Sequence, residues 1–269
     1  MLVLTHFATT ALLYGVACGL FFYVLARGHE GVGKRAFPVL IAGVLSHGVY
    51  VTFDAIGDET PPMADIHQTL TVLSLGIVLA FLVATWRKPG MAILGAFVTP
   101  VVLVFFLASG LGRSVGHVPA GVRSALLPIH IVVNILGIAA FALAFAASIA
   151  YVVQERLLKQ KRLGGIFQRL PPLHVLDTFG LRATSVGVPL LTFSIISGVL
   201  IAVRSQPGLA RLGATQFFAI VAWLLFAGVL LLRVAAGWRG RRAAIGTILG
   251  FACAMAVLIG YVARAGGGA

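Results

Sequence analysis

Histidines are the residues in this sequence whose type and position could support chemistry. His130 stands near the start of SALLPIHIVVNILGIAAFALAFAASIAYVVQER, residues 124–156, where almost every other side chain is apolar. His6 and His67 stand at the start of two other apolar runs, and His47 lies inside a further one. An imidazole can transfer protons or bind a metal ion. These four histidines are therefore the first candidates for a functional site.

The composition places these histidines in a membrane protein. The chain has 269 residues, of which 60% are hydrophobic and 10% charged, and its mean hydropathy of +1.06 is far above that of soluble domains. About 20 apolar residues in a helix cross the hydrocarbon core of a bilayer. We count eight such stretches, which predict one all-α, multi-pass domain over residues 1–269: Leu4–Ala26, Ala36–Ile56, His67–Trp86, Met91–Ser109, Ala125–Val153, Ala183–Val203, Thr215–Ala235 and Ala243–Val262.

Basic residues are divided unequally between the two sets of loops. Of the 20 lysines and arginines, 15 follow the odd-numbered spans: Arg27, Lys34, Arg35, Arg87, Lys88, Arg156, Lys159, Lys161, Arg162, Arg169, Arg182, Arg233, Arg239, Arg241 and Arg242. The other side holds five basic residues, Arg113, Arg123, Arg204, Arg211 and Arg264, and four acidic ones, Asp54, Asp58, Glu59 and Asp65. Because short basic loops stay in the cytoplasm, we expect both termini to be external.

The net charge of +13 has the same origin. Fifteen basic minus three acidic residues give +12 inside, and five minus four give +1 outside. The charge therefore indicates topology and contact with membrane lipids, and it gives no support to nucleic-acid binding. The longest loop, about residues 154–182, is basic and is expected to be an amphipathic cytoplasmic connector. Two cysteines without a CxxC pair, and no nucleotide or hydrolase motif, exclude several enzyme classes.

The direction of each predicted span gives the depth of its histidines. His6, His67 and His130 begin inward-running spans and should share a level near the outer surface, whereas His47 should lie near mid-membrane. Tyr50 and Asp54 follow His47 on the same helical face. Zinc needs three or four close ligands, but these histidines are on separate helices. Heme iron needs only two axial ligands beside an apolar disc, so heme suits them better.

Four segments resemble those of the cytochrome c assembly membrane proteins, the heme-handling family that includes the CcsA, CcmC and HemX types. The similar segments are PPMADIHQTLTVLSL, IHIVVNILGIAAFALAFAASIAYVVQERLLK, LPPLHVLDTFGLRATSVGVPLLTFSIISGVLIA and AWLLFAGVLLLRVAAGWRGRRAAIGTILGFACAMAVLIGYV. In order and spacing they cover most of the chain from about residue 60 onward. The resemblance implies a polytopic helix bundle that handles heme.

Departures from the family pattern restrict what the resemblance implies. Members that attach heme to apocytochrome carry a tryptophan-rich outer motif between spans six and seven, where this chain has RSQPGLARLGATQ. Two further histidines of those members are replaced by Leu231 and by the ending ARAGGGA. We therefore expect no heme-attaching enzyme activity from this chain alone, and the resemblance is closest to the short HemX-like branch.

The family pattern carries over to His130, which resembles an outer axial ligand of heme iron. His67 is the predicted partner ligand, and His6 lies at the same level. His47 could hold a second, deeper heme or form a polar cluster with Tyr50 and Asp54. Arg113 and Arg123, with His117 in the same loop, could meet heme propionates or could be solvated charges.

The Gly/Pro-interrupted sixth span has two interpretations. Gly187, Pro189 and Gly198 could kink the helix around a macrocycle, or they could serve helix packing.

Three functions remain open. The chain could bind or transport heme b, as cofactor or cargo, in cytochrome c assembly, together with another assembly subunit. It could be a HemX-like scaffold or regulator that acts on a heme-biosynthesis enzyme through the basic connector. It could also be a heme b electron-transfer protein. Each function predicts a multi-pass protein of the bacterial inner membrane.

Overall fold

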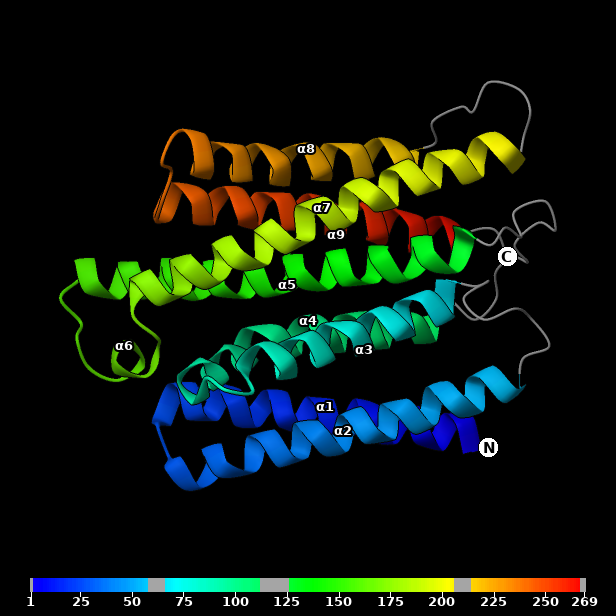
Figure 1. The fold of residues 1–269 in the computed structure, drawn as a ribbon. Coiled ribbons are helices and arrows are strands. Elements are labelled where there is room, and N and C mark those ends of the chain that lie inside the picture. Colours follow the sequence, from blue (N-terminus) through cyan, green and yellow to red (C-terminus); the bar gives the residue numbers. More distant parts are fainter. Residues whose placement is uncertain (1, 58–65, 112–125, 206–213, 267–269) are drawn as a thin grey trace.

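A computed structural model describes residues 2–57, 66–111, 126–205 and 214–266 of the chain (Figure 1). This part is helical throughout and contains no strand. Its long helices are α1 (Leu2–Arg27), α2 (Glu30–Gly57), α3 (Ile66–Thr85), α4 (Gly95–Leu111), α5 (Leu126–Lys159), α7 (Leu173–Ser205), α8 (Ala214–Ala235) and α9 (Arg241–Gly266). Two short helices, η1 (Pro89–Leu94) and α6 (Ile166–Arg169), complete it. The predicted all-α bundle of about eight long helices is confirmed.

Length and composition make most of these helices able to cross a membrane. Within the described ranges, six are long and apolar enough to do so: Val3–Arg27, Gly33–Ala55, His67–Thr85, Pro89–Gly110, Leu126–Lys159 and Leu173–Ile201. A shorter apolar helix covers Ala219–Ala235. A bilayer interior offers no water to the backbone, and a helix satisfies its N–H and C=O groups internally. The chain is therefore a multi-pass membrane protein.

The helices form two groups, and α5 of one group also contacts the other. In Figure 1, α1 to α4 lie in the lower part of the bundle, and α5, α7, α8 and α9 in the upper part. α5 packs along α7 and α9 in its own group and against α3 and α4 in the other. The position of α5 therefore couples the two groups.

The described connectors between the long helices gather at one end of the bundle, and they are rich in basic residues. The ends of α1, α3, α5 and α8 lie at one end, together with α6 and the connectors that follow them (Figure 1). We call this the basic end, because the 15 basic residues of the odd-numbered loops are placed along it. α1 begins and α9 finishes at the opposite end. The helix order thus reproduces the expected separation of charge.

The basic connector is shorter than predicted. α5 continues to Lys159 and α7 begins at Leu173, so only residues 160–172, including α6, lie between the two. α5 extends because its charged end remains amphipathic, with an ion pair between Lys159 and Glu155 one turn earlier (2.8 Å). α7 starts early because Pro171 and Pro172 stand just before its first turn, where proline costs no hydrogen bond.

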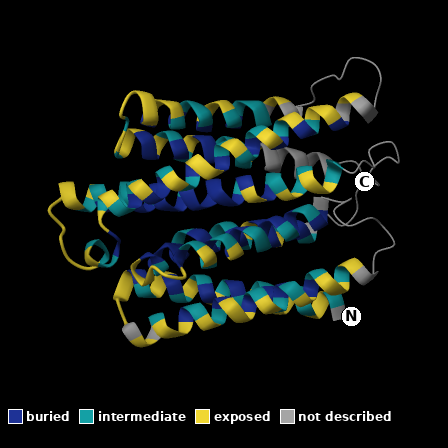
Figure 2. Cartoon of the chain, viewed as in Figure 1, coloured by how far each residue is buried: buried dark blue, intermediate teal, exposed yellow. Residues whose placement is uncertain are grey.

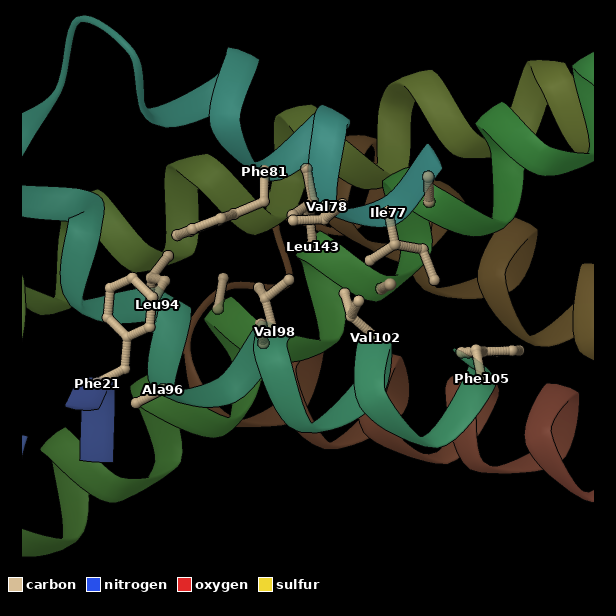
Figure 3. Close-up of a cluster of buried hydrophobic side chains, with 14 of the residues drawn as sticks. Phe21, Ile77, Val78, Phe81, Leu94, Ala96, Val98, Val102, Phe105 and Leu143 are labelled. Carbon is tan, nitrogen blue, oxygen red and sulfur yellow. The ribbon is translucent and has the colours of Figure 1, made fainter. Parts of the chain in front are cut away.

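The core lies where α3, η1, α4 and α5 meet, with α1 at its edge. Figure 2 shows the middle of α5 buried, and Figure 3 shows Phe81, Val98, Val102 and Leu143 pointing toward one another. Phe81 and Val102 are fully buried, and Phe21 of α1 closes the cluster near the basic end. Close packing replaces the hydrophobic effect as the main attraction between helices in lipid.

The sixth apolar span is a single continuous helix. α7 runs through Pro189 without a break. A Cβ placed on Gly187 would lie 2.7 Å from Cε1 of Phe141 in α5, so only glycine leaves room for that ring. Of the two interpretations of this segment, the structure favours helix packing.

A buried ion pair joins α7 to the last turn of α8. Nη2 of Arg233 lies 2.7 Å from Oδ1 of Asp177 and also donates to the Asp177 carbonyl at 2.8 Å. The amide of Gly240 donates to the same Oδ1 at 3.2 Å. The Arg233 side chain is only 4% exposed, and the Asp177 carboxylate is the counterion that balances its buried charge.

We expect the basic end to face the cytoplasm, because positively charged loops are retained there. In a variant with Cys18 and Cys253 replaced by alanine, a cysteine at the exposed Gly164 should resist a membrane-impermeant reagent added to spheroplasts. A cysteine appended after Ala269 should be labelled. Labelling at residue 164 in intact spheroplasts would contradict the topology.

Asp177→Asn should destabilise the protein by about 2 kcal/mol. Breaking a buried pair typically costs roughly 3–5 kcal/mol, but asparagine keeps one acceptor for Arg233. The measurement is reversible unfolding in mixed detergent micelles. Glu155→Gln is the control, because its partner Lys159 is 60% exposed and such pairs contribute less than about 1 kcal/mol. Equal losses in both variants would show that the Arg233 pair has no special role.

Candidate functional site

His130 lies in the second turn of α5 and faces α7. Its Nδ1 is 3.0 Å from the hydroxyl oxygen of Ser197, and the side chain is partly buried. The neighbouring Gly198 makes room for the ring, since a Cβ there would lie 2.9 Å from Cε1 of His130. The imidazole is thus held between two helices at the end of the bundle opposite the basic end.

The other hydrogen bonds of Ser197 favour one tautomer of His130. The hydroxyl oxygen of Ser197 is 2.8 Å from the carbonyl oxygen of Phe193 and 3.0 Å from that of Ser194. A carbonyl can only accept, so the single hydroxyl proton points to one of them. Ser197 then accepts from Nδ1–H of His130. This tautomer leaves Nε2 unprotonated, the form in which imidazole binds a metal.

His67 belongs to a second site, which we call the His67 cluster: Tyr50, Asp54, His67 and the Ser109 carbonyl. Nδ1 of His67 lies 2.6 Å from the Ser109 oxygen, so this nitrogen is a donor. Nε2 lies 3.0 Å from the Tyr50 hydroxyl and 3.1 Å from Oδ2 of Asp54. His67 is 3% exposed, and α2, α3 and α4 supply the groups around it.

His47 and Tyr14 form a hydrogen-bonded pair deeper in the bundle. Nδ1 of His47 is 3.0 Å from the Tyr14 hydroxyl, and both side chains are fully buried. Nε2 of His47 has no hydrogen-bond partner in the part of the chain that the structure describes. Phe106 packs edge-on against the imidazole with ring centroids 4.6 Å apart. The aromatic wall around His47 is therefore already filled.

Tyr50 connects the two groups of polar side chains. Its hydroxyl reaches His67, and its ring lies 6.3 Å from that of His47. The order Tyr14, His47, Tyr50, His67 and Asp54 follows α2 from mid-bundle to its far end, where the Asp54 side chain is 15% exposed. Each of these groups can donate or accept a proton. The arrangement places a chain of titratable groups inside an otherwise apolar bundle, where unpaired polar groups are costly.

The other predicted site residues are more dispersed. His6 is partly buried on α1 and stacks on Phe53 of α2, with ring centroids 5.5 Å apart. As predicted, His6, His67 and His130 all lie in the first two turns of their helices, at the same end of the bundle. Arg113 and Arg123, and His117 with them, fall outside the described residues.

The structure assigns His67 and His130 to different helix pairs. His67 hydrogen-bonds to α2 and α4, whereas His130 hydrogen-bonds to α7. Their pairing as axial ligands stays a prediction.

Two partners in these sites escaped the sequence analysis. Tyr14 is one of many residues in the first span, and only the fold shows that it meets His47. Ser197 is 67 positions from His130, so the contact is tertiary. One signal did exist: the Ser197–Gly198 step lies near the outer end of its span, at the level predicted for His130. A small polar residue beside a glycine is typical of a helix contact in membranes.

The described residues contain no group of three or more His, Cys, Asp or Glu side chains that could hold a metal ion. The sites instead offer single imidazoles on separate helices. Such an arrangement fits a metal that brings most of its own ligands, as heme iron does.

The chain is similar to several known proteins. A family model described as "Cytochrome C assembly protein" matches residues 63–263. Protein HemX of Bacillus subtilis (strain 168) is 35% identical over 138 residues, which are 51% of this chain and 49% of that protein. A "Cytochrome c biogenesis protein CcsA" of Prochlorococcus marinus (strain NATL2A) is 28% identical over 232 residues. The alignment covers 74% of this chain and 72% of that protein. Protein HemX of Brevibacillus brevis is 26% identical over 203 residues, covering 71% of each chain.

Tyr50→Phe should destabilise the bundle by about 1 kcal/mol, the net value of one buried hydrogen bond. Unfolding in mixed micelles measures the loss. Thr52→Ala on the same helix is the control, because Thr52 is exposed and its hydroxyl bonds only the Gly48 carbonyl of its own helix. If Tyr50→Phe is as stable as Thr52→Ala, the hydroxyl does not hold the His67 cluster together.

Proposed function

The chain belongs to the cytochrome c assembly family, and from this premise we propose that it binds heme b, with His130 as an axial ligand. The binding site would lie at the end of the bundle opposite the basic end, which we infer to be the outer face of the bacterial inner membrane. Heme would be either a cofactor or a cargo for another cytochrome c assembly subunit.

One observation carries the proposal: Nδ1 of His130 lies 3.0 Å from the Ser197 hydroxyl oxygen. With Nδ1 as the donor, Nε2 is the unprotonated nitrogen. A metal-binding histidine usually donates its other ring N–H to a neighbouring oxygen, which fixes the ring and raises the basicity of the ligand. His130 already has this arrangement in the protein.

His67 remains the proposed partner ligand, although binding iron would cost it existing hydrogen bonds. Its Nε2 contacts Tyr50 and Asp54, and its Nδ1 contacts the Ser109 carbonyl. Binding iron through Nε2 would require His67 to leave Tyr50 and Asp54. His6, which lies at the same level and stacks on Phe53, is the competing candidate.

Other family-based roles have different support. We propose that Arg113 and Arg123 meet the heme propionates, because both precede His130 in the chain and an arginine binds a carboxylate through paired hydrogen bonds. A deeper heme on His47 is the alternative use of this residue, because its Nε2 has no hydrogen-bond partner among the described residues. We assign His47 to the buried polar chain, since its Nδ1 is hydrogen-bonded to Tyr14 (3.0 Å).

A second candidate function is that of a HemX-like membrane scaffold without bound heme. The observation in its favour is that both nitrogens of His67 are hydrogen-bonded within the protein. In this case the chain would act on a heme-biosynthesis enzyme through the basic end, where the exposed connector 160–165 precedes α6.

Purified protein from cells supplied with a heme precursor should show a Soret band, and His130→Ala should lose most of it. The alanine variant should fold, because His130 is only partly buried at a helix entrance. Added imidazole should restore part of the absorbance by filling the vacated axial position. Absorption spectra before and after dithionite provide the measurement, and His29→Ala, at the basic end, is the control.

Further variants separate the alternatives. His67→Ala should change the spectrum if His67 is the second ligand, and His6→Ala should change it if His6 is. A wild-type protein that never carries heme, or a His130→Ala variant with full heme and an unchanged spectrum, would overturn the ligand role. The absence of heme from the wild type would support the scaffold function.

A further inference from the structure

The basic end of the bundle contains a hollow that the proposed heme site does not involve. Its volume is about 180 Å³, and it lies between the segment after α3 and the first three turns of α7. Three basic side chains, Lys88, His174 and Arg182, surround it. Its lining contains no carboxylate.

The basic residues of the hollow have no partner in the part of the chain that the structure describes. There, the side chains of Lys88, His174 and Arg182 take part in no hydrogen bond or ion pair. Two acidic side chains of this end are already paired: Asp177 with Arg233 (2.7 Å) and Glu155 with Lys159 (2.8 Å). Like charges gathered without a counterion repel each other, so the hollow favours an anion.

The remaining lining of the hollow is largely apolar. Met91, Val175 and Phe179 form its wall, and Met91 is only 3% exposed. Pockets that enclose whole organic ligands measure roughly 300–1,000 Å³. At 180 Å³ this hollow can take only part of a molecule. An anionic group attached to an apolar body fits this size and lining.

The surface beyond the hollow continues in the same direction along α7. Val186 and Phe193, one and three turns after Arg182, are 56% and 50% exposed and lie on the same helical face. At 1.5 Å per residue, the 33 residues of α7 span about 50 Å, more than the roughly 30 Å of hydrocarbon. Its first turns therefore reach the headgroup level, and the exposed stripe enters the region of acyl chains.

We propose that this hollow binds the phosphate headgroup of an anionic phospholipid of the leaflet at the basic end. Lys88 and Arg182 hold the phosphate, His174 adds a ring N–H donor, and an acyl chain follows Val186 and Phe193. Basic hollows between membrane helices at this side of the bilayer are suited to anionic headgroups. The proposal is independent of heme binding at the other end.

Native mass spectrometry of the detergent-solubilised full chain, titrated with phosphatidylglycerol or phosphatidylcholine, tests the proposal. One phosphatidylglycerol molecule should bind in clear preference to phosphatidylcholine. Removing a cation near a membrane surface weakens binding roughly fivefold, so Lys88→Gln/Arg182→Gln should raise the dissociation constant about 25-fold. Arg87→Gln/Arg162→Gln is the matched control, with the same charge change at exposed positions outside the hollow, and should stay within about twofold.

Three results would overturn the proposal. The first is equal binding of phosphatidylcholine and phosphatidylglycerol. The second is an equal loss of affinity in the two double variants, which would indicate only general charge attraction. The third is full displacement of the lipid by millimolar inorganic phosphate, which would assign the hollow to a free phosphate. Thermal unfolding of both variants shows whether each is folded, and a third variant, Lys88→Gln alone, keeps the test valid if the double variant is not.

Discussion

The close packing of α5 on α7 is the constraint on which the rest of the structure depends. Lipid is as apolar as leucine, so helices in a bilayer associate by fitting closely rather than by excluding water. Gly137 of α5 faces the Leu191 backbone, Gly187 of α7 faces Phe141, and Gly198 faces His130. This contact fixes His130 beside Ser197. α5 also packs against α3, so it links the two helix groups.

Most buried polar side chains in the bundle lie where another group satisfies them. His67 is bound by Tyr50, Asp54 and the Ser109 carbonyl, and the charge of Arg233 is held by Asp177. His47, Thr71 and Gln154 are exceptions, because each has one buried polar atom without a partner among the described residues. The two ends of the bundle therefore differ. Hydrogen-bonded imidazoles lie at one end, and basic side chains without a partner among the described residues line the hollow at the other.

The sequence predicts the helices well and their contacts poorly. Hydropathy is a property of consecutive residues, so eight apolar stretches indicate eight long helices and the positions of the charges indicate their direction. The end of α5 was missed because Glu155 and Lys159 look like loop charges until they pair along a helix. Ser197 and Tyr14 could not be assigned to their histidines, because a period of 3.6 residues gives a face but not its neighbour. The family resemblance predicted His130 as a heme ligand, but it could not show that Ser197 contacts the imidazole.

A titration of hemin into apoprotein variants tests the central claim most directly, namely that the α5–α7 contact positions His130 to bind heme. Gly198→Ala adds a Cβ 2.9 Å from Cε1 of His130 and must displace the imidazole, whereas nothing lies within 4 Å of a Cβ at Gly228 in α8. We predict that Gly198→Ala weakens heme binding at least about tenfold, which is roughly 1.4 kcal/mol, while Gly228→Ala leaves it unchanged. Equal affinity in wild type, Gly198→Ala and Gly228→Ala would contradict the account.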